Sequence, residues 1–156
     1  MEKRKRIALV AHDNRKQDLI EWVEFNAFSL REHQIICTGT TGKMIEQQLR
    51  SSLSEEHYGD FEVIKLKSGP LGGDQQLGAM IVDGNVDMMI FFWDPMQPQP
   101  HDVDVKALLR ITVLYNIPTA CNRSTADFMI SSHLFTEAYD RKIKDYSSYI
   151  NREVKM

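Results

Sequence analysis

Short apolar runs alternate with helix-like segments along the chain, and no other sequence feature constrains the fold as strongly. Five runs have the length and composition of buried strands. They cover residues 7–11, 34–37, 61–66, 86–93 and 118–121. Strands that are separated by helices form a parallel sheet with helices on both faces. The sequence therefore predicts a three-layer α/β/α, flavodoxin-like fold with a five-stranded parallel sheet, and a single domain over residues 1–156.

The segments between these runs carry helical periodicity. Helices are expected near residues 15–30, 41–51, 73–82 and 103–115, with further helical segments at the C-terminus. The polar stretch 51–60 is expected to form a surface loop. Three prolines within residues 95–100 predict a fixed loop after the most apolar strand.

Composition restricts the partners and the compartment. The 156 residues include 19 Lys and Arg against 22 Asp and Glu, which gives a net charge of −3. A weakly acidic chain without a long basic run is a poor candidate for binding nucleic acid or an anionic membrane. The apolar run after the basic residues 1–6 is too short for a signal sequence or a membrane span. The two cysteines, Cys37 and Cys121, form no CxxC motif or disulfide framework, which favours reduced thiols and a cytoplasmic location.

Polar and small residues follow four of the expected strands at the point where each strand ends. They are His12, Asp13 and Lys16 after the first, 38–42 (TGTTG) after the second, 68–76 (SGPLGGDQQ) after the third, and Asp94, His101, Asp102 and Asp104 after the fourth. Ligands of open parallel sheets bind beyond the carboxyl ends of the strands. These side chains are therefore expected to share one site.

The TGTTG segment is the best candidate for binding phosphate. Glycines let backbone N–H groups approach an anion, and the following helix offers its positive N-terminal end. Hydroxyl groups and a lysine ammonium on the same rim would add donors. The expected phosphate ligands are Lys16, Thr38, Gly39, Thr40, Thr41, Ser68 and Gly69. Thr and Gly also serve as ordinary helix caps, and this alternative stays open for TGTTG taken alone.

Three carboxylates at these strand exits are candidates for chemistry. Asp74 lies in the first turn of an expected helix, where an acid is often only a favourable partner of the helix dipole. Its position after Gly-Gly, on the rim of the expected phosphate cradle, favours a chemical role. Asp13 has the same ambiguity, because it can cap the helix that follows it. Asp94 follows a strongly apolar strand, where a carboxylate is costly unless it is paired or functional.

His101 and Asp104 lie three residues apart at the start of an expected helix. One interpretation is metal ligation, but no HxH or HExxH motif accompanies them, so no metal site is predicted. The other is a histidine that Asp102 or Asp104 orients and that polarises a carbonyl oxygen. The remaining histidines, His33, His57 and His133, lie in polar surroundings and are expected to be solvated.

Five strings of the sequence together resemble the methylglyoxal synthase family. They are ALVAHDxxK (8–16), TGTTG (38–42), SGPLGGDQQ (68–76), FFWDP (91–95) and HDxDVKALLR (101–110), and the resemblance runs in order from about residue 7 to residue 127. It implies conversion of dihydroxyacetone phosphate to methylglyoxal and inorganic phosphate without a metal or an organic cofactor. It also implies a homohexamer of flavodoxin-like subunits that phosphate inhibits cooperatively.

The resemblance further implies a role for each matching residue. Asp74 matches the catalytic base, and His101, with Asp104 or Asp102 beside it, would donate a hydrogen bond to the developing enediolate oxygen. The positions that match substrate ligands are His12, Lys16, Thr38, Gly39, Thr40, Thr41, Ser68, Gly69 and His101. Asp13, Asp94 and Asp104 match further acids that line the pocket.

The chain departs from the family pattern at three places. Val103 stands where many members have Pro, so the turn at His101 is expected to be less fixed. The stretch 51–60 resembles a surface insertion, which the fold should tolerate. Arg152 lies one residue out of register with an arginine that some members place in the site of a neighbouring subunit.

Two other functions fit a similar fold. The regulatory domain of carbamoyl phosphate synthetase has a similar pocket that only binds anionic effectors, but an anion sensor gains nothing from added acids such as Asp74 and Asp94. A response-regulator receiver domain needs a phosphoacceptor Asp after the third strand and a Lys after the fifth. This chain has Ser68 at the first of these exits and Asn122 with Arg123 at the second. An enzyme is therefore favoured.

Overall fold

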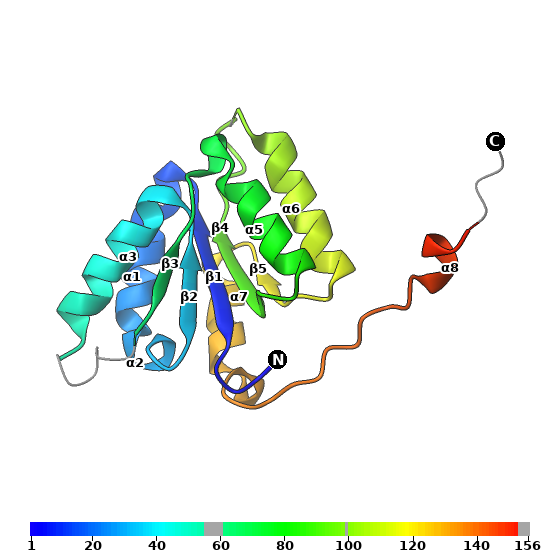
Figure 1. Cartoon of the computed structure of the whole chain (residues 1–156). Coiled ribbons are helices and arrows are strands. Elements are labelled where there is room, and N and C mark those ends of the chain that lie inside the picture. The colour runs from blue at the N-terminus through cyan, green and yellow to red at the C-terminus, as the bar shows by residue number, and fades with distance from the viewer. Residues whose placement is uncertain (55–60, 99, 153–156) are drawn as a thin grey trace.

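The computed structural model describes residues 1–54, 61–98 and 100–152, and its centre is a five-stranded sheet (Figure 1). The strands are β1 (Arg6–Ala11), β2 (Gln34–Cys37), β3 (Val63–Lys65), β4 (Met88–Phe92) and β5 (Thr119–Ala120). Every pairing between neighbouring strands is parallel, and the strand order is β3-β2-β1-β4-β5. From β1 the chain adds β2 and β3 on one side, and then crosses over β1 to add β4 and β5 on the other side. The switch point of the sheet therefore lies between β1 and β4.

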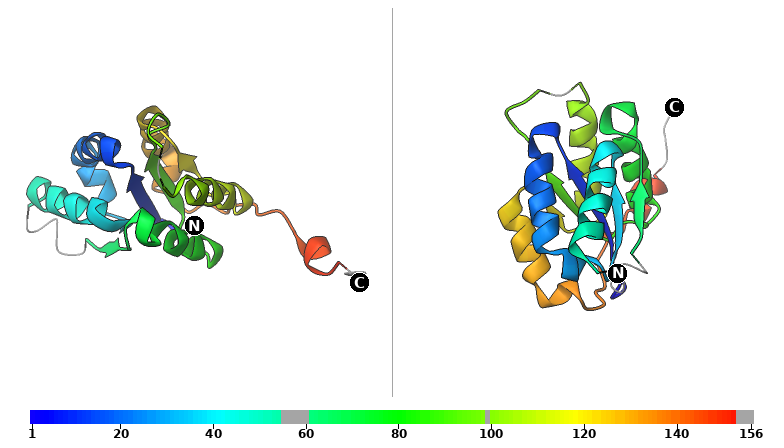
Figure 2. Two further views of the ribbon diagram at one scale, coloured as in Figure 1. Left: turned by 90° about the horizontal axis from the view of Figure 1, so that it is seen from above. Right: turned by 90° about the vertical axis from the view of Figure 1, so that its left-hand side faces the viewer.

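Helices cover both faces of this sheet (Figures 1 and 2). The α-helices are α1 (Lys16–Phe25), α2 (Ala27–Leu30), α3 (Gly39–Ser52), α5 (Gly73–Val82), α6 (Asp102–Leu114), α7 (Arg123–Ser131) and α8 (Ser147–Ile150), and the 3-10 helices are η1 (Asp13–Arg15), η2 (Gly69–Leu71) and η3 (His133–Phe135). Helices α1, α3 and α7 pack on one face, and α5 and α6 pack on the other. The predicted three-layer, flavodoxin-like arrangement with a parallel sheet is confirmed.

Alternation of side chains along the strands builds one apolar core on each face. In β1, Ile7 and Leu9 belong to the core under α1, α3 and α7, whereas Ala8 and Val10 belong to the core under α5 and α6. Burial of each large apolar side chain contributes about 1.5–3 kcal/mol to stability. The two cores together hold the carboxyl ends of the strands at one edge, where the site lies.

The expected helix over residues 15–30 is broken at Asn26. The backbone N–H and the Nδ2 of Asn26 both donate to the carbonyl of Trp22, at 3.1 and 2.8 Å. This local side-chain bond competes with continuation of the helix and ends α1 at Phe25. Helix α3 extends to Ser52, so the first residues of the expected surface loop are helical. Residues 55–60 of that loop lie outside the described residues.

His33 is buried, which contradicts the expectation that it is solvated. Its side chain is 2% exposed, packs edge-to-face on Phe135, and accepts a hydrogen bond on Nδ1 from the Lys5 N–H at 3.1 Å. The cause is the N-terminal segment, which folds back over this end of the sheet. There the Lys5 ammonium donates to the carbonyls of Glu2 and Glu137. His57 lies outside the described residues.

The C-terminal segment leaves the body of the molecule after η3. It runs outward and carries α8 far from the sheet, as Figure 1 and the left view of Figure 2 show. Arg152 lies there with its guanidinium carbon 3.8 Å from the ring centroid of Tyr149, so it does not reach the site of its own chain. Within the described parts of the chain, no helix is both long and apolar enough to cross a lipid bilayer.

Candidate active site

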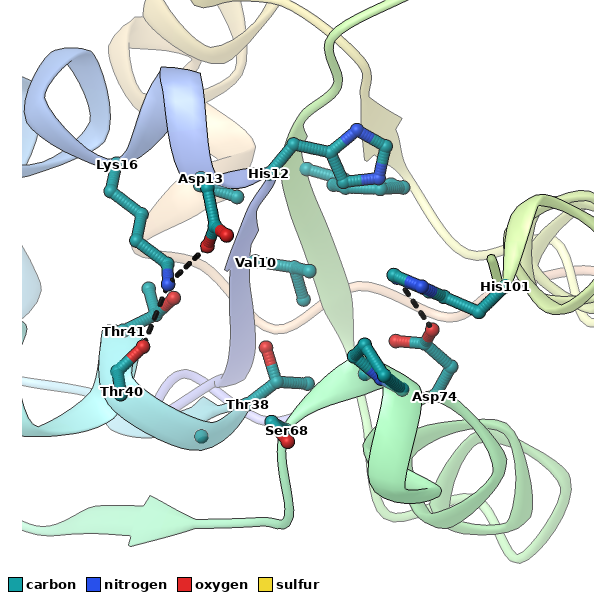
Figure 3. A pocket seen from close by; sticks show the side chains of 15 residues that line it. Val10, His12, Asp13, Lys16, Thr38, Thr40, Thr41, Ser68, Asp74 and His101 are labelled. Atoms are coloured by element: carbon teal, nitrogen blue, oxygen red, sulfur yellow. Dashed lines mark hydrogen bonds and ion pairs between the residues drawn. The ribbon is translucent and has the colours of Figure 1, made fainter. Parts of the chain in front are cut away.

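A cavity of about 80 Å³ lies at the carboxyl ends of the strands, beside the switch point between β1 and β4 (Figure 3). Four stretches of the chain line it. They contribute Val10, Ala11, His12, Asp13 and Lys16, then Thr38, Gly39, Thr40 and Thr41, then Ser68, Gly69, Pro70 and Asp74, and finally Phe91 and His101. The predicted catalytic and ligand-binding residues are among them, whereas Asp94, Asp102 and Asp104 are not.

Lys16 and Thr40 form one wall of the cavity (Figure 3). The Lys16 Nζ donates to the Thr40 Oγ1 at 2.7 Å and lies 2.6 Å from Oδ1 of Asp13. The hydrogen bond from Lys16 lowers the pKa of the Asp13 carboxyl. The ammonium is thereby held at the rim, between the exits of β1 and β2, where an anionic ligand can reach it.

Gly39 begins α3 and differs from its expected role. Its N–H donates to the carbonyls of Leu66 and Lys67, at 3.1 and 3.0 Å, and so serves the fold and not a ligand. Gly39 has a φ of +41°, and a Cβ there would lie 2.7 Å from the Cα of Ser68. Glycine therefore allows the exits of β2 and β3 to approach. The first-turn amides of a helix have no partner inside it, which leaves Thr40 and Thr41 as helix-end donors at the cavity.

Asp74 and His101 form the opposite wall. Asp74 is 6% exposed, and burial raises the pKa of its carboxyl. The Asp74 Oδ2 lies 3.7 Å from the Nε2 of His101, which is too long for a hydrogen bond. This oxygen is buried and has no hydrogen-bond partner among the residues that the structure describes. A buried carboxylate oxygen without a partner is well suited to accept a proton from a ligand.

Gly69 lets the loop after β3 pass close to both groups of this wall. A Cβ on Gly69 would lie 2.8 Å from the His101 Nε2 and 3.1 Å from the Asp74 Oδ2. The same loop is held from behind by Gln76, whose Oε1 accepts a hydrogen bond from the Lys67 N–H at 2.8 Å. A side chain larger than hydrogen at residue 69 would therefore occupy the space between base and histidine.

His12 extends into the cavity from the end of β1. It is 5% exposed, and burial lowers its pKa. Its Nδ1 accepts a hydrogen bond from the Asp94 N–H at 3.3 Å, and its Nε2 is buried without a partner among the described residues. The ring packs edge-to-face on Phe91 and lies 6.0 Å from the ring of His101 between centroids. Two imidazoles thus face the same part of the cavity.

Asp94 does not line the cavity, which differs from the expectation. Its Oδ1 accepts a hydrogen bond from the Met96 N–H at 3.0 Å, and its Oδ2 accepts one from the Asn14 Nδ2 at 3.1 Å. The carboxylate is therefore paired with Met96 in its own loop and with Asn14 after β1. The backbone N–H of Asp94 donates a hydrogen bond to a cavity residue, His12.

Asp104 also stays outside the cavity lining. It lies in the first turn of α6, and its negative charge adds to the rise in the pKa of Asp74. The expected hydrogen bond from His101 to Asp102 or Asp104 does not form at Nδ1, because this nitrogen is buried without a partner among the described residues. The reason is position: His101 precedes α6 and its ring turns toward Asp74 (Figure 3), whereas both acids belong to the helix.

The cavity carries no evident set of metal ligands. Across residues 1–54, 61–98 and 100–152, no group of three or more His, Cys, Asp or Glu side chains could hold a metal ion. The donors that face the cavity are an ammonium, hydroxyls, amides and imidazoles, which suit an anion and a carbonyl oxygen.

Comparison with known proteins places this geometry in a family. The family model described as MGS-like domain matches residues 18–121. The chain is also 56% identical to methylglyoxal synthase of Maridesulfovibrio salexigens over 157 aligned residues, which cover 99% of this chain and 100% of that one. The chain belongs to the methylglyoxal synthase family.

Other members of the methylglyoxal synthase family agree over nearly the full length. Methylglyoxal synthase of Oleidesulfovibrio alaskensis is 53% identical, with 97% of each chain aligned. The crystal structure of methylglyoxal synthase from Elizabethkingia anophelis NUHP1 matches with a TM-score of 0.87 and 50% identity, over 99% of this chain and 95% of that one.

Two residues that hold the loops around the cavity were not predicted from the sequence to have this role. Gln76 holds the loop after β3 through the Lys67 N–H, and Asn14 holds the loop after β4 through Asp94. Gln76 lies inside the SGPLGGDQQ string, which was a usable signal. Asn14 falls on an unspecified position of ALVAHDxxK, so nothing in the pattern pointed to it.

Proposed function

We propose that this chain catalyses the methylglyoxal synthase reaction, in which dihydroxyacetone phosphate loses phosphate by way of an enediolate and gives methylglyoxal and inorganic phosphate. The observation that carries the proposal is the buried Oδ2 of Asp74, which lacks a hydrogen-bond partner among the described residues. It faces a cavity whose opposite wall holds Lys16 and Thr40. Elimination of phosphate next to a carbonyl needs a base and an anion cradle in one cavity.

The first step removes a proton from the hydroxymethyl carbon, which lies beside the carbonyl. Asp74 is the base, since a carboxylate acts by accepting a proton through a free oxygen. Burial raises the pKa of Asp74 and so makes it a stronger base than an exposed carboxylate. The base form is lost as the pH falls through this raised pKa, so activity declines at acid pH.

The second requirement is stabilisation of the enediolate oxygen. His101 and His12 present ring nitrogens to the side of the cavity on which Asp74 lies. A donor that is already aimed at a developing oxyanion contributes roughly 3 kcal/mol to lowering the barrier. Asp104 acts through its charge on Asp74 and not as a ligand.

The third requirement is control of the bond to phosphate. Elimination needs this carbon–oxygen bond out of the enediolate plane, whereas an isomerase holds it near the plane and keeps the phosphate. Lys16, the Thr40 hydroxyl and the N–H groups of Thr40 and Thr41 bind the phosphate, set this torsion and stabilise the leaving charge. The released enol then forms methylglyoxal.

One assay tests the proposed reaction. Purified protein is incubated with dihydroxyacetone phosphate in the presence of EDTA, and phosphate and dicarbonyl are both measured. We expect the two products in equal amounts, with rates unchanged by the chelator. A protein that only senses anions would release neither product, and a metal-dependent enzyme would be silenced by EDTA.

We also propose that the enzyme is a cytoplasmic homohexamer that inorganic phosphate inhibits cooperatively, and that residues 1–156 act as one domain. Phe25, Phe28 and Phe128 are 87%, 61% and 79% exposed, which suits burial between subunits. Two free cysteines suit a reducing compartment. Light scattering on the purified chain should report six copies, and a stable monomer at micromolar concentration would contradict the assembly.

A further inference from the structure

Only one ring nitrogen of His12 is engaged within the described structure. Nδ1 accepts the hydrogen bond from the Asp94 N–H, and Nε2 is buried without a partner among the described residues. A ring nitrogen that accepts a hydrogen bond from an amide carries no proton. The hydrogen of the neutral ring therefore lies on Nε2, and His12 presents a donor to the cavity.

A small network holds the Asp94 amide in place. The Asp94 carboxylate accepts hydrogen bonds from the Met96 N–H and from the Asn14 side chain, at 3.0 and 3.1 Å. The same Asn14 amide donates to the Oε1 of Gln97. Asn14 lies in η1 directly after β1, and Asp94 follows β4, so the network ties together the strand exits on the two sides of the switch point.

We propose that Asn14 and Asp94 are positioning residues that fix His12 as its neutral Nε2–H tautomer, so that His12 donates a hydrogen bond to an oxygen of the bound triose phosphate. This role rests on the proposed reaction for its substrate. It assigns His12 to stabilise the carbonyl or enediolate oxygen. It also excludes His12 as a proton acceptor in the cavity and leaves that task to Asp74.

A purely structural histidine would not explain these contacts. Packing of the ring on Phe91, with 5.1 Å between centroids, does not depend on which nitrogen carries the hydrogen. A buried donor without a partner destabilises the fold unless a ligand supplies an acceptor. The unpaired Nε2 therefore indicates that a ligand binds here. Because Nδ1 accepts a hydrogen bond, Nε2 carries the hydrogen and is a donor.

Asn14→Ala is the direct test, because Asn14 is exposed and its removal leaves both cores intact. Nitrogen-15 NMR on histidine-labelled protein reports the tautomer, and His12→Gln assigns the signal. We expect His12 of the wild type in the Nε2–H form and a mixture of tautomers in Asn14→Ala. Turnover should fall about 10–100-fold with KM changed less than about threefold, the scale for lost orientation of a group near the reaction.

Gln17→Ala is the matched control. Gln17 is exposed, lies one turn further along, and contacts Glu21 at 3.3 Å. The reciprocal double variant, Asn14→Asp with Asp94→Asn, exchanges donor and acceptor and should restore both the tautomer and most of the turnover. Asp94→Ala alone should resemble Asn14→Ala, because the loop loses its acceptor for the Met96 N–H.

The outcomes separate this proposal from the proposed reaction. His12 in the Nδ1–H form, or a tautomer that stays unchanged in Asn14→Ala, would overturn the positioning role whatever the activity. A wild-type protein that makes no methylglyoxal but shows the Nε2–H form would overturn the reaction and leave the positioning intact. Failure of the reciprocal variant to recover would contradict the hydrogen bond between Asn14 and Asp94 as the cause.

Discussion

Single residues decide how close the two walls of the cavity come. Gly69 is the clearest case, because the position of its missing Cβ is 2.8 Å from the His101 Nε2 and 3.1 Å from the Asp74 Oδ2. Both atoms are candidates for contact with the reacting part of the substrate. The absence of a side chain at residue 69 therefore shapes the site directly.

We predict that Gly69→Ala lowers kcat/KM by about 10²-fold or more, since displacement of a reacting group by an ångström can have this effect. Steady-state kinetics with dihydroxyacetone phosphate measure it. Gly78→Ala in α5 is the control, because a Cβ there meets only the Ile111 Cδ1 at an ordinary 3.6 Å. Equal activity of the two variants would show that the loop has room at Gly69.

Residue types at the strand exits were enough to predict most of the residues that line the cavity. The aspartates show where such prediction stops. Asp74 lies in the cavity as expected, but the Asp94 carboxylate pairs with the Met96 N–H and Asn14. A sequence shows that an acid follows a strand but not the direction of its side chain, which depends on the hydrogen bonds that the side chain forms in the folded protein. For the same reason, the sequence could not show that the His101 ring turns toward Asp74 and leaves its Nδ1 unbonded to Asp102 or Asp104.

At the scale of elements, the exits of β1 and β2 build the anion cradle jointly. Lys16 opens α1 and Thr40 lies in the first turn of α3, and the two side chains meet at 2.7 Å. The ammonium also contacts Asp13 at 2.6 Å, so the ion pair holds Lys16 in place until an anion arrives. Neither element alone would form the cradle.

We predict that Lys16→Ala weakens binding of inorganic phosphate about 10–100-fold, the range for loss of a hydrogen bond from a charged group. Isothermal titration with phosphate measures the change. Lys43→Ala, on an exposed position of α3, is the control and should leave the affinity near that of wild type. An unchanged phosphate affinity in Lys16→Ala would remove Lys16 from the cradle.

The boundaries of elements were predictable where strong local signals exist. α5 begins and ends at the predicted residues, 73 and 82, because a glycine turn precedes it and apolar periodicity fills it. The break at Asn26 was missed, because it depends on one side-chain bond to the Trp22 carbonyl inside a periodic stretch. The periodicity of apolar residues indicates which face of a helix is buried. It carries no information about a single side-chain hydrogen bond that ends the helix.

At the scale of the whole molecule, the end of the sheet opposite the cavity has its own titratable group. Burial lowers the pKa of His33 to about 4 from 6.5, and the Lys5 N–H donates to its Nδ1. Between these two pH values the unfolded chain binds a proton that the folded chain excludes. The folded state therefore loses stability as the pH falls from about 6.5 to about 4, on the order of 3 kcal/mol in all.

We predict that His33→Gln makes the free energy of unfolding depend less on pH over this interval. Urea unfolding between pH 4 and pH 7 measures the free energy, and the variant should lose less of it than the wild type over this interval. His133→Gln, at an exposed position, is the control and should follow the wild type. Parallel curves for His33→Gln and wild type would contradict a neutral buried His33.

Turnover of Asp74→Asn tests the central claim most directly, because the amide keeps the shape of the side chain and cannot accept the proton. Formation of methylglyoxal is measured alongside phosphate affinity, which reports the cradle independently. We predict that turnover falls about 10²–10⁴-fold while phosphate still binds, since only the base is removed. Near-normal turnover in Asp74→Asn would contradict the assignment of the base and, with it, the chemistry of the cavity.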